Sequence, residues 1–135
     1  MRRFLFALAF SGLSAPVFAD EARNPAIEGV IQHQFDAFLA EDETAAFSYA
    51  SPLIQGIFGT AANFGMMVRN GYPMVWHPAE VKYLGLRTVA GRQYQKVAIT
   101  DDDGALHVLE YEMVPAGDGW VIGGVQVLQQ PEIGA

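Results

Sequence analysis

One histidine and one tyrosine lie in residues 105–115, a stretch that is predicted to be a β-strand. His107 and Tyr111 differ by an even number, so both side chains fall on the same face of an extended strand, together with Leu109 and Met113. If this face lines a hollow, the imidazole and the phenol are candidates for acid–base catalysis or for hydrogen bonding to a ligand. The alternative is that the face points to solvent or to a second subunit, because both faces of the strand carry apolar residues.

A second candidate pair lies nearer the N-terminus, where Asp36 follows His33 by three residues. Residues three apart lie on the same face of a helix, so a general base and its orienting partner could meet there. The alternative is a solvated polar face opposite Ile31 and Phe35, which follows from the helical periodicity of the apolar residues. Asp36 therefore joins His107 and Tyr111 as a candidate acid or base.

The sequence contains no motif for metal binding or for nucleophilic catalysis. His33, His77 and His107 are isolated from one another, and the chain has no cysteine. The run Asp101–Gly104 lacks the spaced oxygen donors of a calcium loop and is instead typical of a hairpin turn. No serine sits in a Gly-x-Ser-x-Gly elbow. The sequence therefore predicts neither a cofactor nor a metal site.

The apolar stretch NFGMMVRNGYPMVWHP, residues 63–78, is a candidate pocket wall. Methionine and aromatic residues at helical spacing usually belong to a core, and that interpretation comes first. In a domain where the core surrounds a hollow, the same side chains can also line a site for a small hydrophobic ligand. The candidates for ligand binding are Phe64, Met67, Tyr72 and Trp76.

Three helices are predicted before residue 72, each with a capping residue in front of it. The helices run from Pro25 to about Glu41, from Asp42 to Ser51 and from Thr60 to Arg69, with a short apolar turn at 53–58. Gly71 is expected to stop the third helix in a left-handed conformation. Tyr72-Pro73 is then expected to start an extended segment.

Four strands are predicted after the helices, at about 79–89, 92–100, 105–115 and 119–128. The segments between them contain glycine, and two also contain aspartate, which is typical of β-hairpins. Helices that precede strands in this way predict an α+β domain with three helices on one face of a strongly curved antiparallel sheet of four or slightly more strands.

The last strand, WVIGGVQVL at residues 120–128, is apolar on both sides and is therefore expected inside the sheet. Gly123-Gly124 in its middle indicates a bulge or a sharp bend. Simple alternation would place Trp120, Ile122 and Leu128 on one face, and Val121, Val125 and Val127 on the other.

The first nineteen residues match a secretory signal peptide. Arg2 and Arg3 precede an apolar run, and Val17-Phe18-Ala19 forms a cleavage site after Ala19. The run is shorter than the roughly 20 residues of a membrane-spanning helix. We therefore expect a periplasmic or secreted domain, residues 20–135, without stable membrane anchoring.

The charge of the chain excludes one class of partner. The formal net charge is −7, and removal of the two N-terminal arginines with the signal peptide lowers it to −9. Nucleic-acid binding needs clustered lysine and arginine, and the six basic residues that remain are scattered. A nucleic-acid partner is therefore not expected.

Three stretches resemble the nuclear transport factor 2-like superfamily of cystatin-like cones, and more narrowly an exported bacterial family known only as a domain of unknown function. These stretches are IQHQFDAFLAEDETAAFSYASPLIQGIFGT (31–60), NFGMMVRNGYPMVW (63–76) and DGWVIGGVQ (118–126). The resemblance implies a cone-shaped fold that commonly forms homodimers through the outer face of its sheet. It does not select a function, because the superfamily includes enzymes and binding domains.

Three hypotheses remain open from the sequence. The favoured one is a non-catalytic domain that binds a small apolar ligand or a protein partner, as a homodimer. The second is a cone-fold enzyme for proton transfer or water addition, resembling an isomerase, dehydratase or hydrolase. The third is an interaction subunit with a filled cone. A cavity with few charges favours the first, and a cavity around an acid or base with a perturbed pKa favours the second.

Overall fold

The structure is a computed structural model that describes residues 22–129 and residue 131. The expected signal peptide, residues 1–19, lies outside the described residues. In the described chain, helices precede strands in the order α1 Pro25–Leu39, α2 Glu43–Ser48, α3 Pro52–Phe58, α4 Ala61–Gly71, α5 Pro73–Trp76, β1 Glu80–Val89, β2 Arg92–Thr100, β3 Leu106–Ala116 and β4 Gly119–Gln129. The α+β class and the four antiparallel strands are confirmed.

Four of the helices begin at a residue whose side chain accepts a hydrogen bond from the first turn, which is why the chain turns into a helix at those points. The capping residues are Asn24 for α1, Asp42 for α2, Ser51 for α3 and Thr60 for α4. Proline follows the cap in α1 and α3, where its missing N–H group costs no hydrogen bond.

The described residues contain five helices rather than the three that were predicted. The apolar turn at 53–58 is part of the complete helix α3. The left-handed stop at Gly71 and the extended segment after it were wrong, because Gly71 is still helical and Pro73 at once starts α5. Tyr72 links the two helices with φ −137° and ψ 60°, and its backbone N–H bonds to the Val68 carbonyl. A proline at the first helical position explains why helix, and not strand, follows.

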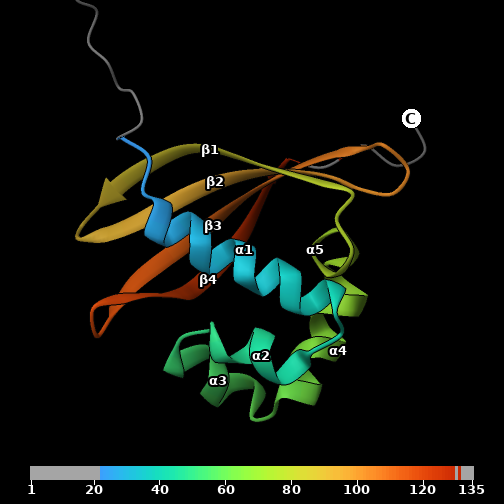
Figure 1. Ribbon diagram of the computed structural model, residues 1–135, viewed down its shortest axis with the longest axis horizontal. Helices are drawn as coiled ribbons and strands as arrows, with labels where there is room; N and C mark the ends of the chain where they lie inside the picture. Colours follow the sequence, from blue (N-terminus) through green and yellow to red (C-terminus); the bar gives the residue numbers. More distant parts are fainter. Residues whose placement is uncertain (1–21, 130, 132–135) are drawn as a thin grey trace, which may run out of the picture.

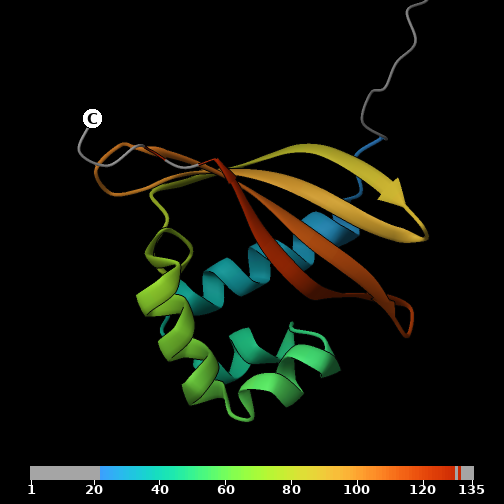
Figure 2. The same ribbon diagram turned by 180° about the vertical axis from the view of Figure 1, so that it is seen from behind.

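The sheet has the strand order β1-β2-β3-β4, with a tight hairpin between each pair of neighbours. Gly91, Gly104 and Gly117 sit in the three turns at φ +82°, +82° and +58°, a conformation that glycine adopts without a steric penalty. All five helices lie on one side of the twisted sheet, and α1 crosses directly beneath it (Figures 1 and 2). No helix of the described residues lies on the other side of the sheet.

Strand β4 lies at an edge of the sheet, so its expected place in the interior was wrong. The edge is nevertheless covered, because the segment between α2 and α3 pairs with it. The Ser51 N–H donates to the Ile122 carbonyl at 2.8 Å, and the Ile122 N–H donates to the Tyr49 carbonyl at 2.9 Å. This bridge satisfies backbone groups of the edge strand at Ile122.

A β-bulge in β4 confirms the break that Gly123-Gly124 indicated. Glu112 pairs with Gly124 and Met113 pairs with Ile122, which leaves Gly123 as the extra residue. The extra residue reverses the alternation beyond it, so Val125 joins Ile122 on the inner face. The facing expected from simple alternation was therefore wrong for Val125, Val127 and Leu128.

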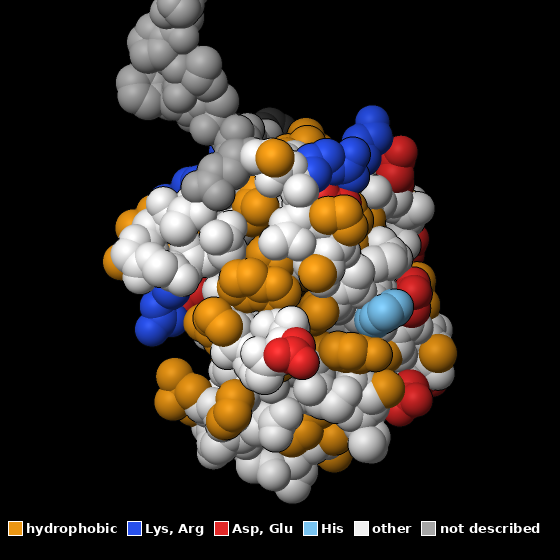
Figure 3. Space-filling view, turned by 60° about the vertical axis from the view of Figure 1, so that its left-hand side comes forward, with side chains coloured by type: hydrophobic (Ala, Val, Ile, Leu, Met, Phe, Trp, Pro, Cys, Tyr) orange, Lys and Arg blue, Asp and Glu red, His pale blue; other side chains and the backbone are white. Residues whose placement is uncertain are grey.

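The hydrophobic core lies between α1 and the inner face of the sheet. Ile27, Ile31, Phe35 and Phe38 form one buried stripe along α1. The opposing inner residues of the sheet are buried as well, among them Val97, Ile99, Leu109, Tyr111 and Met113. Hydrophobic side chains also gather on the surface shown in Figure 3, with lysine and arginine side chains at its margins.

Candidate functional site

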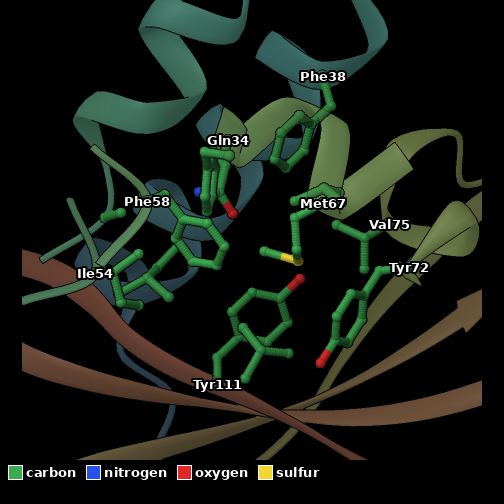
Figure 4. A pocket seen from close by; sticks show the side chains of 13 residues that line it. Gln34, Phe38, Ile54, Phe58, Met67, Tyr72, Val75 and Tyr111 are labelled. Atoms are coloured by element: carbon green, nitrogen blue, oxygen red, sulfur yellow. The ribbon is translucent and has the colours of Figure 1, made fainter. Parts of the chain in front are cut away.

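A cavity of about 150 Å³ lies between the helices and the inner face of the sheet (Figure 4). Its wall draws on α1, α3, α4, α5, β3 and β4, so both the helices and the sheet are needed to form it. The lining residues are Gln34, Phe38, Ala50, Ile54, Phe58, Phe64, Met67, Val68, Tyr72, Val75, Tyr111, Ile122 and Val125. None of these side chains carries a charge.

Three of the four residues expected to bind a ligand line this cavity: Phe64, Met67 and Tyr72. Trp76 does not belong to the lining. It packs against Phe38 with ring centroids 5.4 Å apart, and the Arg69 guanidinium lies 4.6 Å from the centre of its ring. The short helix α5 turns Trp76 toward this second environment, which an extended segment would not have done.

Tyr111 supplies a buried polar group beside the cavity. Its side chain is 1% exposed, and its hydroxyl has no hydrogen-bond partner within the described structure. Figure 4 shows the hydroxyl directed toward the sulfur of Met67. Burial raises the pKa of the Tyr111 hydroxyl far above its usual value, so the group stays protonated and neutral.

Gln34 is a cavity residue that the sequence reasoning missed. Its Nε2 donates to the Ala46 carbonyl at 3.0 Å, and this buried bond fixes the orientation of the amide. The amide oxygen then faces the cavity (Figure 4). A signal was present, since Gln34 lies three residues after Ile31 and four before Phe38, within the buried stripe of α1. A glutamine at such a position needs a polar partner, which makes it a candidate.

Helix α3 forms the outer cover of the cavity. Ile54 and Phe58 point into the cavity and are only partly buried, whereas Leu53 and Ile57 are 72% and 67% exposed. The helix has no fully buried residue. Gln55 ties it to the preceding helix by donating to the carbonyls of Phe47 and Ala50 at 3.1 and 3.0 Å. A cover that is this weakly buried opens at a lower cost than the core of the domain.

His107 and Tyr111 share the inner face of β3 with Leu109 and Met113, as the alternation indicated, but they border different hollows. His107 lies beside a second pocket of about 210 Å³ next to α5, with Met74 and His77 in its wall. The two candidate residues are therefore not brought together around one reacting centre.

The imidazole of His107 is anchored to the hairpin between β2 and β3. Its Nε2 lies 2.8 Å from Asp101 Oδ2, and its Nδ1 is buried without a partner in the described structure. Asp101 also accepts the backbone N–H groups of Asp103 and Ala105 at 2.9 Å. The bond from His107, followed by the bond from Ala105, lowers the pKa of the Asp101 carboxyl. These contacts hold the hairpin turn in place.

His33 and Asp36 are both exposed on α1, outside the cavity. The Asp36 carboxylate accepts a hydrogen bond from Gln32 Nε2 at 3.0 Å, while the His33 ring lies 5.9 Å from the ring of Tyr49. The structure therefore places this candidate pair on the solvated side of the helix.

The described part of the chain offers neither a metal centre nor a membrane-spanning helix. No group of three or more histidine, cysteine, aspartate or glutamate side chains is arranged to hold a metal ion there. Among the helices of residues 22–129, none is long and apolar enough to span a bilayer.

The comparisons with known proteins identify a family without assigning a function. Neither the comparison with curated proteins nor the comparison with solved structures returned a match. A family model described as a domain of unknown function, DUF4864, matches residues 20–135. The match spans the whole described fold, including every residue of the cavity wall, and the chain belongs to the DUF4864 family.

Proposed function

We propose that the protein is a non-catalytic binding domain that holds a small apolar molecule in the cavity beneath α3. The observation that carries this proposal is the lining itself, in which aliphatic and aromatic side chains surround an uncharged space. Binding sites for small molecules are mostly apolar, with a few polar groups that orient the ligand. Tyr111 and Gln34 are the polar groups in this wall.

The size of the cavity limits the ligand. Cavities of roughly 150 Å³ with apolar walls accept a molecule the size of benzene. The space here, about 150 Å³, therefore suits a compact ligand with roughly one ring. A larger ligand would have to displace α3, whose residues are only partly buried or exposed.

Catalysis is the second candidate, because Tyr111 was named as an acid or base and lies in the wall. Proton transfer needs a group that can accept a proton near the reacting atom. The raised pKa of Tyr111 keeps its hydroxyl protonated, and no carboxylate or imidazole lines the same cavity. Asp36 and His107 lie elsewhere, which favours binding over acid–base chemistry.

We also propose that the domain acts in the periplasm or outside the cell after loss of residues 1–19. The three-part pattern of these residues supports this location. The family match begins at residue 20, the first residue after the expected cleavage site. The likeness to cystatin-like cones is part of the same proposal, and the one-sided packing of helices on a twisted sheet supports it.

A homodimer formed through the open face of the sheet is proposed as the working assembly. No described helix covers this face, and Leu84, Leu106 and Leu128 are 42%, 46% and 45% exposed there. Pairing of two such faces would remove these leucines from water. Sedimentation analysis of the wild type should give a dimer that Leu106→Lys converts to a monomer. A monomer at every concentration of the wild type contradicts the assembly.

Native mass spectrometry of protein purified without denaturation tests the binding function. We expect a fraction of the wild type to carry the extra mass of one small molecule, released on denaturation. The variant Val125→Phe places a ring in the cavity from the adjacent strand and should run at the bare mass of the chain. Equal extra mass on both proteins would exclude this cavity as the site.

A further inference from the structure

Two hydrogen-bonding groups at the cavity wall are available to a ligand, and one of them is buried without a partner. The Tyr111 hydroxyl is buried and makes no hydrogen bond within the described structure. The Gln34 amide already uses Nε2 on the Ala46 carbonyl, which leaves its oxygen turned to the cavity (Figure 4). Buried polar groups in folded proteins nearly always have a partner, so the Tyr111 hydroxyl points to a bound polar atom, and Gln34 Oε1 offers the same ligand an acceptor.

From these two groups we infer that the natural ligand is a compact neutral molecule that carries a hydroxyl group, with phenol as the simplest representative. This inference rests on the proposed binding function. One ligand oxygen would satisfy both groups, since the ligand O–H can donate to Gln34 Oε1 while the same oxygen accepts from the Tyr111 O–H. The ring of the ligand would then fill the apolar space between Phe58, Met67 and Val125.

Other ligand classes fit the same wall less well. A charged ligand would lose its hydration without a countercharge, because no charged residue lines the cavity. A ketone could accept from Tyr111 but could not donate to Gln34, so it would form one hydrogen bond fewer than a hydroxyl compound. A hydrocarbon would form no hydrogen bond with either group and would leave the buried Tyr111 hydroxyl without a partner. The hydroxyl compound is therefore the class that completes the site.

Met67 controls access to the Tyr111 hydroxyl. In Figure 4 the Tyr111 hydroxyl points toward the thioether of Met67, and the Met67 side chain is only partly buried. An unbranched methionine side chain changes rotamer at little cost. Movement of this side chain would expose the hydroxyl to a ligand that enters beneath α3.

Titration calorimetry of the purified protein with phenol, toluene and benzoate tests the inference. We expect phenol to bind about tenfold more tightly than toluene, the factor that one ordinary hydrogen bond contributes. Benzoate should give no measurable binding. Tyr111→Phe should reduce the affinity for phenol about tenfold and leave the affinity for toluene unchanged.

A matched variant shows whether the loss of phenol affinity is specific to the Tyr111 hydroxyl or follows from removing any tyrosine hydroxyl. Tyr83 also lies on the inner face, where its hydroxyl donates to Gln32 Oε1 at 2.8 Å, and it does not line the cavity. Tyr83→Phe should therefore bind phenol like the wild type.

The outcomes distinguish the two levels of the proposal. Equal binding of phenol and toluene by the wild type overturns the hydroxyl inference and leaves the apolar binding function intact. A phenol preference that survives Tyr111→Phe overturns the assignment of this residue. If neither phenol nor toluene binds, the proposed function fails together with the inference.

Discussion

At the scale of single residues, Tyr111 carries a cost to stability that the proposed binding function would explain. A buried hydroxyl without a hydrogen bond destabilises the folded state by about 1–3 kcal/mol. The Tyr111 hydroxyl is in this position within the described structure. A group that weakens the free protein and serves a ligand is typical of a binding site.

Tyr111→Phe is expected to raise the free energy of unfolding of the ligand-free protein by about 1 kcal/mol, because it removes the buried hydroxyl without creating a cavity. Urea unfolding at neutral pH measures the change. Tyr83→Phe serves as the control, since it removes a hydroxyl that has a partner and should lower stability. A loss of stability in Tyr111→Phe as large as that in Tyr83→Phe would show that the Tyr111 hydroxyl has a partner in solution.

Asp101 makes the stability of the hairpin depend on pH. His107 and the Ala105 N–H lower its pKa in the folded state, while the unfolded value is about 3.9. The stabilisation is therefore fully present above pH of about 4 and is lost as the pH falls through the lower folded pKa. Asp101→Asn should be less stable than the wild type at pH 7, and this difference should disappear in strong acid.

Unfolding midpoints measured between neutral and strongly acidic pH check this expectation. Asp102→Asn is the matched control, because the neighbouring Asp102 is exposed and has no hydrogen bond to its carboxylate among the described contacts. The account is wrong if Asp101→Asn and the wild type differ by the same amount at every pH.

The sequence allowed the strand residue Tyr111 and the helix residues Phe64 and Met67 to be named as site candidates, because alternation and helical spacing are local properties. It could not reveal which of them face a common hollow. Gln34 was missed because its role depends on the carbonyl of Ala46, twelve residues away. Trp76 was placed in the wall because the turn at Pro73 was expected to be extended.

At the scale of elements, α3 is the part of the fold on which we expect the proposed ligand exchange to depend. It has seven residues and none is fully buried, so it opens at a lower cost than α1 or β3. Gly56 in its middle has open space where a side chain would stand. Gly56 therefore lowers the stability of helix α3, and no close contact requires a glycine at this position.

Gly56→Ala is expected to raise stability by about 0.5–1 kcal/mol and to slow the exchange of toluene, because alanine favours the closed helix. Gly29→Ala is the control. Gly29 lies in α1, also has open space around it, and does not line the cavity. It should gain similar stability without slowing exchange. Equal exchange rates in both variants, measured by NMR line shapes, would rule out α3 as the gate.

The strands were predicted nearly to the residue because glycine-containing turns and β-branched runs mark their ends locally. The position of β4 at the edge was not predictable in the same way. The strand looked apolar on both sides because the bulge, which turns Val125 to the inner face, was not included in the alternation, and the backbone of its edge pairs with residues 49–51 from a different part of the chain. The bulge at Gly123 was indicated by composition, yet only the register with Glu112 and Met113 shows which residues change face.

At the scale of the whole molecule, the cavity exists because helices and sheet do not fill the space between them. Residues from 34 to 125 contribute to its wall. The α+β class followed from the order of helices and strands in the sequence. The cavity instead depends on how helices and strands that are far apart in the sequence pack against one another. The same packing leaves one face of the sheet open. The proposed ligand cavity and the proposed dimer face therefore lie on opposite sides of the sheet.

The most direct test of the central claim is a methyl NMR titration of the purified protein with toluene, which asks whether the cavity takes up a small apolar molecule. We expect saturable shifts of the methyl signals of Met67, Ile54 and Val125, which line the cavity, while Leu106 on the open face of the sheet does not respond. Val125→Phe should abolish the remaining shifts. Shifts that fail to saturate, or that persist unchanged in Val125→Phe, would contradict the claim.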